Sequence, residues 1–506
     1  MKSIANSLVL VLSFLCLKLA TGESPDIVMI AIDDLRPMLG CYGDSRIKSP
    51  NIDSLASRGV VFERAYCQYA KCGTSRLSVM SGLRPDSIGI FSNNSADVSR
   101  FRELRPDVNS LASWLKRSGY HTQSFGKIYH DGWDNPADWS AESYPGRDRE
   151  MLEVVDAENP SSPTVIAERL DCPVIQSPDV DDEHLFAGRM TTRVIGTLDH
   201  FQSQKPLFLA IGFRRPHLPF VAPKKYFDRY SVDDSWLAGN QVPDPRTTNL
   251  SWFNSDGYIG TARRVGLEMP VRPDHAEAIA WNGYEMRSYR GVPNQGPIPV
   301  ATQINLIHAY AACISYVDAQ IGRILDQLQR SPRFKNAIII LWSDHGWHLG
   351  EQSAWGKMTN FEIATRVPLI IAAPGVRHGR TDQLAELVDV YPTLCDLAKI
   401  DQPDHLEGDS LLPVLRSGGS TTDSIALSQY ARFRERYMGR AIRTQRYRYV
   451  AWFDQRENSI VGRELYDHQV DPHENNNLAL RNDHTELVAS FDKQLQHAFK
   501  LTATKH

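Results

Sequence analysis

The sequence predicts an α/β protein whose main domain is built on a mostly parallel sheet, followed by a smaller C-terminal α+β domain with an antiparallel sheet. Short apolar runs alternate with segments of helical periodicity, which is the pattern of strand–helix–strand units. The chain has 506 residues, more than one ordinary core holds. After residue 418 aromatic and basic residues alternate in part. We therefore expect a main domain over residues 23–418 and a C-terminal domain over residues 419–506.

Residues 1–22 have the features of a secretory signal peptide. Lys2 provides the positive start, Leu8–Cys16 the apolar stretch, and Gly22 a small residue at the cleavage point. The apolar run is short and is soon followed by Lys18, which argues against a membrane anchor. We expect an exported protein, periplasmic or secreted, with no membrane segment after the signal is removed.

Five short runs predict the strands of the main sheet, most of them apolar on both faces as in strands buried between helices. They are Asp26–Ile32, His121–Gly126, Pro206–Phe213, Ala337–Trp342 and Val367–Ala373. Helical periodicity predicts helices over Leu111–Ser118, Gly188–Phe201 and Gln303–Leu328. Residues from about 231 to 300 are rich in Pro, Asn and Gly, so we predict long ordered loops, a common location for substrate specificity.

In the C-terminal region Arg440–Phe453 predicts an antiparallel sheet, Gly462–Asp467 follows it, and Glu486–Leu501 predicts a final helix. The region is rich in arginine, and two interpretations remain open for these side chains. They form either a solvated sheet face or a basic wall for an anionic sugar. The arginines concerned are Arg432, Arg434, Arg436 and those within residues 440–448.

Net charge and cysteine content narrow the classes of function that the protein can have. The formal net charge of −4 gives no case for nucleic-acid binding, so an anionic substrate requires a local cluster of cations. The six cysteines that remain after residue 22 are scattered, without the paired spacing of zinc sites, and do not favour a disulfide framework. Most are interpreted as small buried residues.

Acidic pairs follow two of the predicted strands. Asp33-Asp34 and Asp344-His345 both lie at the carboxyl ends of strands, where sites in parallel sheets form. One carboxylate there could instead cap a helix or pair with Arg36. Two adjacent carboxylates repel each other unless a cation lies between them, so we predict a metal site. Three carboxylates favour a hard cation such as calcium or magnesium, and the imidazole leaves room for a transition metal.

The segment Cys72-Gly-Thr-Ser-Arg76 is predicted to begin a helix. Cys72 is either an ordinary core residue or a thiolate nucleophile activated by the helix N-terminus and Arg76. Beside a metal, such a nucleophile would suit displacement at an anionic sulfur or phosphorus centre.

Together these motifs resemble the sulfatase family, and within it the iduronate-2-sulfatase-like members. Sulfatases carry Cys-x-Pro-Ser-Arg, which Cys72, Ser75 and Arg76 match, whereas Thr74 stands where the family has Pro or Ala. The resemblance implies an alkaline-phosphatase-like α/β sandwich and one calcium ion. It implies that a formylglycine-generating enzyme oxidises Cys72, so that one hydroxyl of the hydrated aldehyde attacks sulfur and the other expels sulfate. The implied metal ligands are Asp33, Asp34, Asp344, His345 and the modified Cys72, and Arg76 belongs to the implied catalytic set.

The resemblance also assigns roles to four scattered side chains that would otherwise be ordinary surface or structural residues. Lys127 would orient the hydrate, and His130 would be the base for sulfate release. His217 would bind sulfate and donate a proton, and Lys357 would contact sulfate and protonate the leaving group.

The predicted function is hydrolysis of a sulfate ester on a carbohydrate, with iduronate-2-sulfate as the nearest analogy. Fold and motif do not determine the sugar. Two alternatives remain open. One is a phosphomonoesterase or phosphonate hydrolase on the same scaffold, and the other is a non-catalytic binder of sulfated glycans whose Cys72 stays unmodified.

Overall fold

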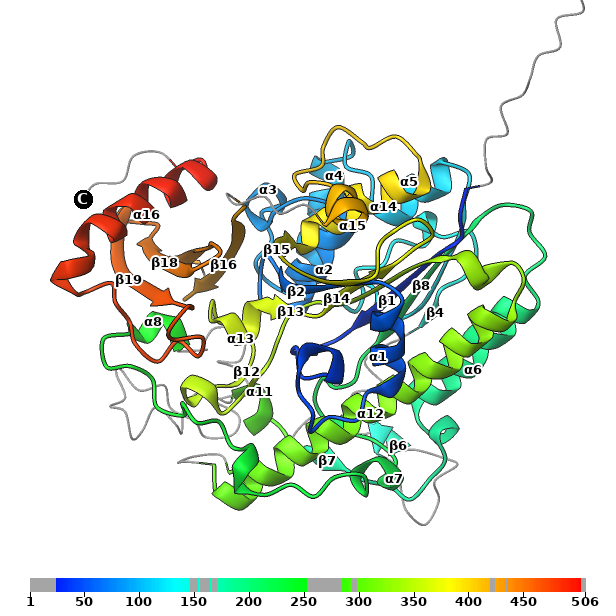
Figure 1. Cartoon of the computed structure of the whole chain (residues 1–506), viewed down its shortest axis with the longest axis horizontal. Coiled ribbons are helices and arrows are strands. Elements are labelled where there is room, and N and C mark those ends of the chain that lie inside the picture. Colours follow the sequence, from blue (N-terminus) through cyan, green and yellow to red (C-terminus); the bar gives the residue numbers. More distant parts are fainter. Residues whose placement is uncertain are drawn as a thin grey trace, which may run out of the picture.

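The computed structural model describes residues 24–145, 153–154, 164–165, 171–252, 284–293, 298–418, 424–433 and 435–501. Figure 1 shows a large domain around a central sheet and a smaller domain at the C-terminal end. The predicted signal peptide, Arg434 and part of the predicted loop segment 231–300 lie outside the described residues. Where that segment is described it forms turns and short helices, including α8 (Asn249–Trp252) and α11 (Tyr284–Arg287).

The central sheet has the order β13-β2-β14-β10-β1-β8-β3-β4, and β15 pairs with β2 outside this path. Strands β10, β1, β8, β3 and β4 are parallel neighbours, and β15 is parallel to β2. The bounds are β1 Ile27–Ile32, β2 Val60–Tyr66, β3 His121–Gly126, β4 Tyr144–Pro145, β8 Leu207–Phe213, β10 Ile338–Ser343, β13 Arg366–Val367, β14 Leu369–Ala372 and β15 Gly379–Glu386.

The predicted strand Val367–Ala373 differs from the observed one. It is divided into β13 and β14 at Pro368, which has no N–H to donate to a neighbouring strand. β14 also runs antiparallel to β10 and to β2, so the sheet is mostly but not wholly parallel. Because two successive antiparallel pairings restore the direction, β2 runs the same way as β1 and β10.

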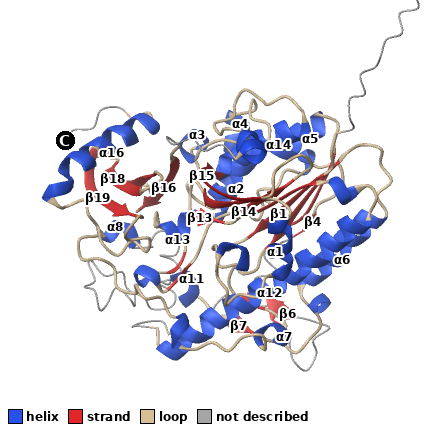
Figure 2. Ribbon diagram, viewed as in Figure 1, coloured by secondary structure: helices blue, strands red, loops and turns tan. Residues whose placement is uncertain are grey.

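Helices cover both faces of this sheet (Figure 2). Alternate residues of β1 pack into two separate cores, Val28 and Ile30 on one face and Ile27 and Met29 on the other, which explains why the strand is continuously apolar. One face is covered by α1 (Pro50–Ser57), α6 (Phe186–Asp199), α7 (Lys224–Phe227) and α12 (Val300–Arg330). The other is covered by α2 (Cys72–Ser81), α3 (Pro85–Ile88), α4 (Ser95–Leu104), α5 (Leu111–Arg117), α14 (Val390–Ala398) and α15 (Leu412–Ser417).

The C-terminal domain is an antiparallel four-stranded sheet that carries a helix on one face. Its elements are β16 Ala426–Arg432, β17 Tyr437–Arg443, β18 Tyr447–Asp454, β19 Ser459–Asp467 and α16 Thr485–Ala498. This confirms the predicted α+β arrangement, although β16 was not predicted. Among the described residues no helix is both long and apolar enough to cross a membrane.

Three arginines of this sheet, Arg440, Arg443 and Arg448, form neither a solvated face nor a free basic wall, whereas the side chains of Arg436 and Arg446 are 41% and 50% exposed. Arg448, 1% exposed, pairs with Glu362 of α13 (Glu362–Thr365) at 2.5 Å and with Glu474 at 2.6 Å. Arg443 also pairs with Glu362, and Arg440 pairs with Asp86 of the main domain. Both interpretations of the sequence are therefore wrong for these three side chains, because main-domain carboxylates lie against them.

Candidate active site

The predicted site residues meet at the edge where the parallel strands end. Asp33 and Asp34 follow β1, Asp344 follows β10 and Lys127 follows β3. β2 ends at this edge too and leads through a short loop to Cys72, the first residue of α2. The shared strand direction thus brings together residues that lie far apart in the sequence.

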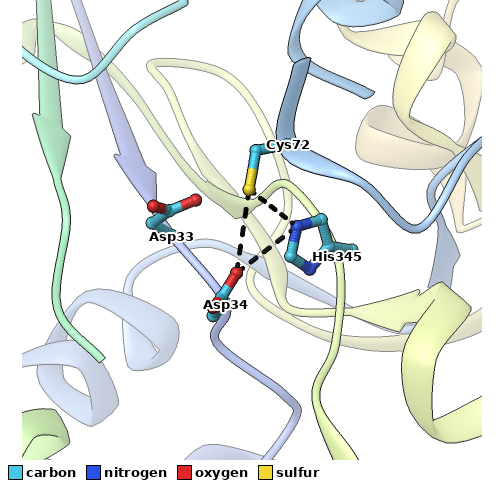
Figure 3. A group of neighbouring side chains, drawn as sticks. All are labelled: Asp33, Asp34, Cys72 and His345. Carbon is cyan, nitrogen blue, oxygen red and sulfur yellow. Dashed lines mark hydrogen bonds and ion pairs between the residues drawn. The ribbon is translucent and has the colours of Figure 1, made fainter. Parts of the chain in front are cut away.

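Four side chains form a tight buried cluster: Asp33, Asp34, Cys72 and His345 (Figure 3). One ligand atom from each lies within 4.8 Å of the others. The Cys72 sulfur is 3.3 Å from His345 Nε2, and that nitrogen is 3.4 Å from an oxygen of Asp34. His345 Nδ1 faces the Gly346 carbonyl at 3.0 Å, which leaves Nε2 directed at the cluster.

Asp344 lies beside this cluster rather than within it. Its Oδ2 accepts a hydrogen bond from Arg76 Nε at 2.8 Å and lies 3.7 Å from His345 Nε2. Its Oδ1 accepts hydrogen bonds from the backbone amides of Asp34 and His345, both at 3.1 Å. Asp344 therefore holds together the two segments that carry the predicted metal ligands, and its own role as a direct metal ligand stays a prediction.

Arg76 is completely buried and links three parts of the site. Besides Asp344 it contacts Asp33 at 3.3 Å and donates to the Lys127 carbonyl. A buried guanidinium is stable only when its charge is paired and its donors are satisfied, and here two carboxylates and backbone oxygens do so. Arg76 therefore fixes the position of the predicted metal ligands.

Two lysines contact the acidic pair. Lys127 Nζ lies 2.5 Å from Asp33, and Lys357 Nζ lies 2.8 Å from Asp34 and 3.4 Å from the Cys72 sulfur. Lys357 follows the hairpin of β11 (His348–Leu349) and β12 (Trp355–Gly356). Burial lowers the pKa of Lys357, but Asp34 and the other nearby anionic groups outweigh it and hold that pKa well above its ordinary value. Lys357 is therefore charged.

The acidic pair fits a bound cation. Burial, opposed in part by Lys357, holds the pKa of Asp34 well above its ordinary value. Burial also raises the pKa of Asp33, but the positive charges of Lys127 and Arg76 outweigh this effect and hold that pKa well below its ordinary value. The lysines and Arg76 thus neutralise Asp33 more fully than Asp34. Two carboxylates and an imidazole in one buried cluster are a suitable donor set for a divalent ion.

His217 and Glu285 complete the inner part of the site. His217 Nδ1 lies 2.6 Å from the Leu218 carbonyl oxygen. The other ring nitrogen, Nε2, lies 3.9 Å from an oxygen of Asp34 and 3.4 Å from an oxygen of Glu285. The other carboxylate oxygen of Glu285 lies 3.6 Å from Lys357 Nζ. Glu285 was not predicted from the sequence. It lies in the segment interpreted as loops, and no spacing or motif distinguishes it there.

His130 lies at the margin of the cluster. It follows Lys127 by three residues and is partly exposed, and both residues line a cavity of 350 Å³ with Asp131 and Asp134. Burial, followed by the charge of Lys127, lowers the pKa of His130 to about 3, so the ring is neutral near pH 7. Within the described part of the chain its Nδ1 has no hydrogen-bond partner. No described hydrogen bond or ion pair joins it to Cys72.

Cys72 is almost fully buried, at 2% exposure. Burial, followed by the charge of Asp33, raises the pKa of its thiol to about 11. The unmodified side chain is therefore a thiol rather than a thiolate near pH 7, which disfavours direct attack by cysteine. The arrangement instead suits a modified residue 72 acting beside a cation and two lysines.

Solved structures share this fold. The phosphonate monoester hydrolase of Agrobacterium radiobacter superposes with a TM-score of 0.68, covering 94% of this chain and 95% of that chain at 20% identity. A structure solved in complex with its substrate, D-glucosamine-2-N,6-O-disulfate, has a TM-score of 0.65, covering 95% and 98% at 21% identity. Identities this low show the fold alone, which is the predicted alkaline-phosphatase-like sandwich.

Sequence comparison identifies the family within this fold. The sulfatase family profile matches residues 25–400, and a profile described as N-sulphoglucosamine sulphohydrolase, C-terminal, matches residues 350–500. Human iduronate 2-sulfatase is 32% identical over 93% of this chain and 95% of that protein. The chain belongs to the sulfatase family and is a sulfuric ester hydrolase. The resemblance inferred from the sequence motifs is confirmed.

Proposed function

We propose that this protein is an exported sulfatase that removes sulfate from a sulfated carbohydrate, using formylglycine at position 72 and one calcium ion. One observation carries the proposal. The sulfur of Cys72 lies in a buried cluster, 3.3 Å from His345 and 3.4 Å from Lys357, beside two carboxylates suited to a cation. These contacts support the proposal because the residue that the family modifies lies close to candidate metal ligands and to a candidate sulfate contact.

Asp33, Asp34, His345 and the modified residue 72 would hold the calcium, with Asp344 in support. When bound, the ion supplies a fixed positive charge that polarises the sulfate oxygens. Formylglycine supplies a hydrated aldehyde whose two hydroxyls permit attack on sulfur and then release of sulfate.

The remaining residues bind the anion and move protons. Lys357, charged and within 3.4 Å of residue 72, contacts sulfate and protonates the leaving oxygen. Lys127 orients the nucleophilic hydroxyl. His217 would contact sulfate through Nε2, which must then carry a proton because Nδ1 donates to the Leu218 carbonyl. His130 is neutral and partly exposed, but a pKa of about 3 makes it a weak base for the release step. Proton donation by His217 and catalysis by His130 stay predictions.

The carbohydrate substrate is proposed from the relatives. Iduronate 2-sulfatase and the neighbour bound to a glucosamine disulfate both act on sulfated sugars by their names. Export is proposed from residues 1–22, and it places the protein in the periplasm or outside the cell. A formylglycine-generating enzyme, or an equivalent, is the maturation partner that the proposal requires.

The proposal is tested by producing the protein together with a formylglycine-generating enzyme and comparing aryl sulfate with aryl phosphate of the same leaving group. Mass spectrometry of the Cys72 peptide gives the converted fraction. We expect sulfate hydrolysis to rise in proportion to that fraction, and a panel of sulfated monosaccharides, including iduronate-2-sulfate, to identify the sugar. Faster phosphate hydrolysis would favour a phosphatase. Glycan affinity without turnover in fully converted protein would favour a binding protein.

Replacing Lys357 by Ala should reduce hydrolysis of sulfate esters with poor leaving groups more than hydrolysis of activated aryl sulfates. The reason is that a poor leaving group depends on protonation, whereas a good one departs as an anion. The check is kcat/KM across a series of aryl sulfates whose leaving groups differ in pKa. Equal losses across the series would assign Lys357 to sulfate binding only.

Replacing Thr74 by Pro should raise the fraction of Cys72 converted in a heterologous host, because Pro is the residue that the family carries there. Thr74 is the third residue of α2, and proline is tolerated in a first helical turn. The substitution removes the hydrogen bond from Thr74 Oγ1 to the Ile90 carbonyl, which should lower stability by about 1 kcal/mol. Peptide mass spectrometry and thermal unfolding measure the two effects. An unchanged converted fraction would show that Thr74 does not limit maturation.

A further inference from the structure

Glu285 is a buried carboxylate that the proposed chemistry does not use. It belongs to α11, and its side chain is 4% exposed. One oxygen lies 3.4 Å from His217 Nε2, and the other lies 3.6 Å from Lys357 Nζ. These two neighbours are the proposed sulfate contacts. A carboxylate therefore lies beside the same atoms that would receive the substrate anion.

This position affects the charge that the pocket accepts. Lys357 already pairs with Asp34, with contacts of 2.8 and 3.0 Å, so Glu285 adds a second carboxylate near the same ammonium group. Interactions between charges are stronger in a buried site than in water, because the effective dielectric constant is lower. Each negative charge that a ligand brings near Lys357 is thus opposed by Glu285.

We propose that Glu285 selects substrates by charge, admitting monoanionic esters and disfavouring dianionic ones. The inference rests on the proposed function, since it assumes that the ester group binds at His217 and Lys357. A sulfate monoester has one negative charge, and so has a phosphonate monoester. A phosphate monoester carries about 1.5 to 2 negative charges at pH 7. An unfavourable charge placed against the wrong ligand is a common basis of specificity.

The proposal predicts that selectivity follows the charge of the ester, not whether its central atom is sulfur or phosphorus. If Glu285 acts through charge, it opposes phosphate monoesters but treats sulfate and phosphonate monoesters alike. The test uses three substrates with one aryl leaving group: the sulfate, the methylphosphonate and the phosphate. Each is assayed with wild-type protein and with Glu285→Gln, which keeps the shape of the side chain and removes its charge.

We expect Glu285→Gln to lower the ratio of kcat/KM for sulfate over phosphate about tenfold. The ratio for sulfate over phosphonate should change less than about twofold. Glu285→Asp keeps the charge and shortens the side chain, so it should lose activity on all three esters while keeping the wild-type ratios. Asp228→Asn removes an exposed charge that pairs with Lys224 at the end of α7, so it should leave every ratio unchanged.

Two results would overturn the inference. One is an unchanged sulfate-to-phosphate ratio in Glu285→Gln, and the other is an equal change in Glu285→Gln and Glu285→Asp, which would indicate shape rather than charge. If Glu285→Gln fails to fold, competitive inhibition of wild-type protein decides the question. Methylphosphonate monoester should then inhibit more strongly than phosphate monoester of the same alcohol, and the reverse order would contradict the inference. Absence of sulfate hydrolysis by converted wild-type protein would instead refute the proposed function.

Discussion

Replacing Cys72 by Ser should abolish sulfate ester hydrolysis, with a loss on the order of a thousandfold or more. A serine side chain has one hydroxyl where the hydrated aldehyde has two, so it could accept sulfate but has no second hydroxyl on the same carbon to expel it. The measurement is turnover of an aryl sulfate at matched protein concentration.

The control for this prediction is the wild-type protein in preparations with different converted fractions. Activity should follow the fraction of Cys72 converted, with fuller conversion in the native host than in a heterologous one. The Cys72→Ser protein should unfold at the wild-type temperature, since the change is small and the site is otherwise intact. Full activity from protein whose Cys72 is wholly thiol by mass spectrometry would contradict the mechanism.

Replacing Asp344 by Ala should reduce both activity and stability. The substitution leaves the buried guanidinium of Arg76 with a single carboxylate, Asp33 at 3.3 Å, and removes the acceptor for two backbone amides. Breaking a buried charge pair typically costs about 3–5 kcal/mol. Thermal unfolding with and without added calcium measures the effect. We expect a lower unfolding temperature in both conditions and a smaller increase on adding calcium than in wild-type protein.

A matched control is Asp382→Ala. Asp382 also pairs with an arginine, Arg64 at 3.2 Å, but its side chain is 75% exposed. Exposed ion pairs contribute about 0–1 kcal/mol, so this variant should unfold near the wild-type temperature. Equal stability of the two variants would show that Asp344 does not hold the site together.

Most of the central sheet was predictable because its strands are buried on both faces. The predicted bounds of β3 agree with the observed ones, and β1, β8 and β10 differ by one residue at their ends. β2 and β15 were not predicted. Their sequences, VVFERAY and GRTDQLAE, carry charged residues at partly or fully exposed positions, so neither forms a long apolar run. β2 is a strand mainly because β14 and β15 pair with it, and β15 is a strand because it pairs with β2.

The candidate metal ligands and the lysines were predictable because they occur in recognisable segments that follow strands. The arrangement among them was not. The Asp344 carboxylate accepts hydrogen bonds from Arg76 and from two backbone amides. These bonds depend on the directions of side chains, which cannot be predicted from the spacing of residues in the sequence. Glu285 reaches the site from a helix of four residues inside a segment without periodicity. Only the contacts with His217 and Lys357 identify it.

The pairing of Glu362 with Arg448 has a consequence for biosynthesis. Arg448 lies 86 residues after Glu362, so during synthesis the carboxylate has no such partner until most of the chain has emerged. An unpaired buried charge is costly, and we therefore expect the segment from Lys357 to α13 to become ordered late. Since Lys357 contacts Cys72, the nascent chain would keep that cysteine accessible to an oxidising enzyme until the ribosome has nearly finished.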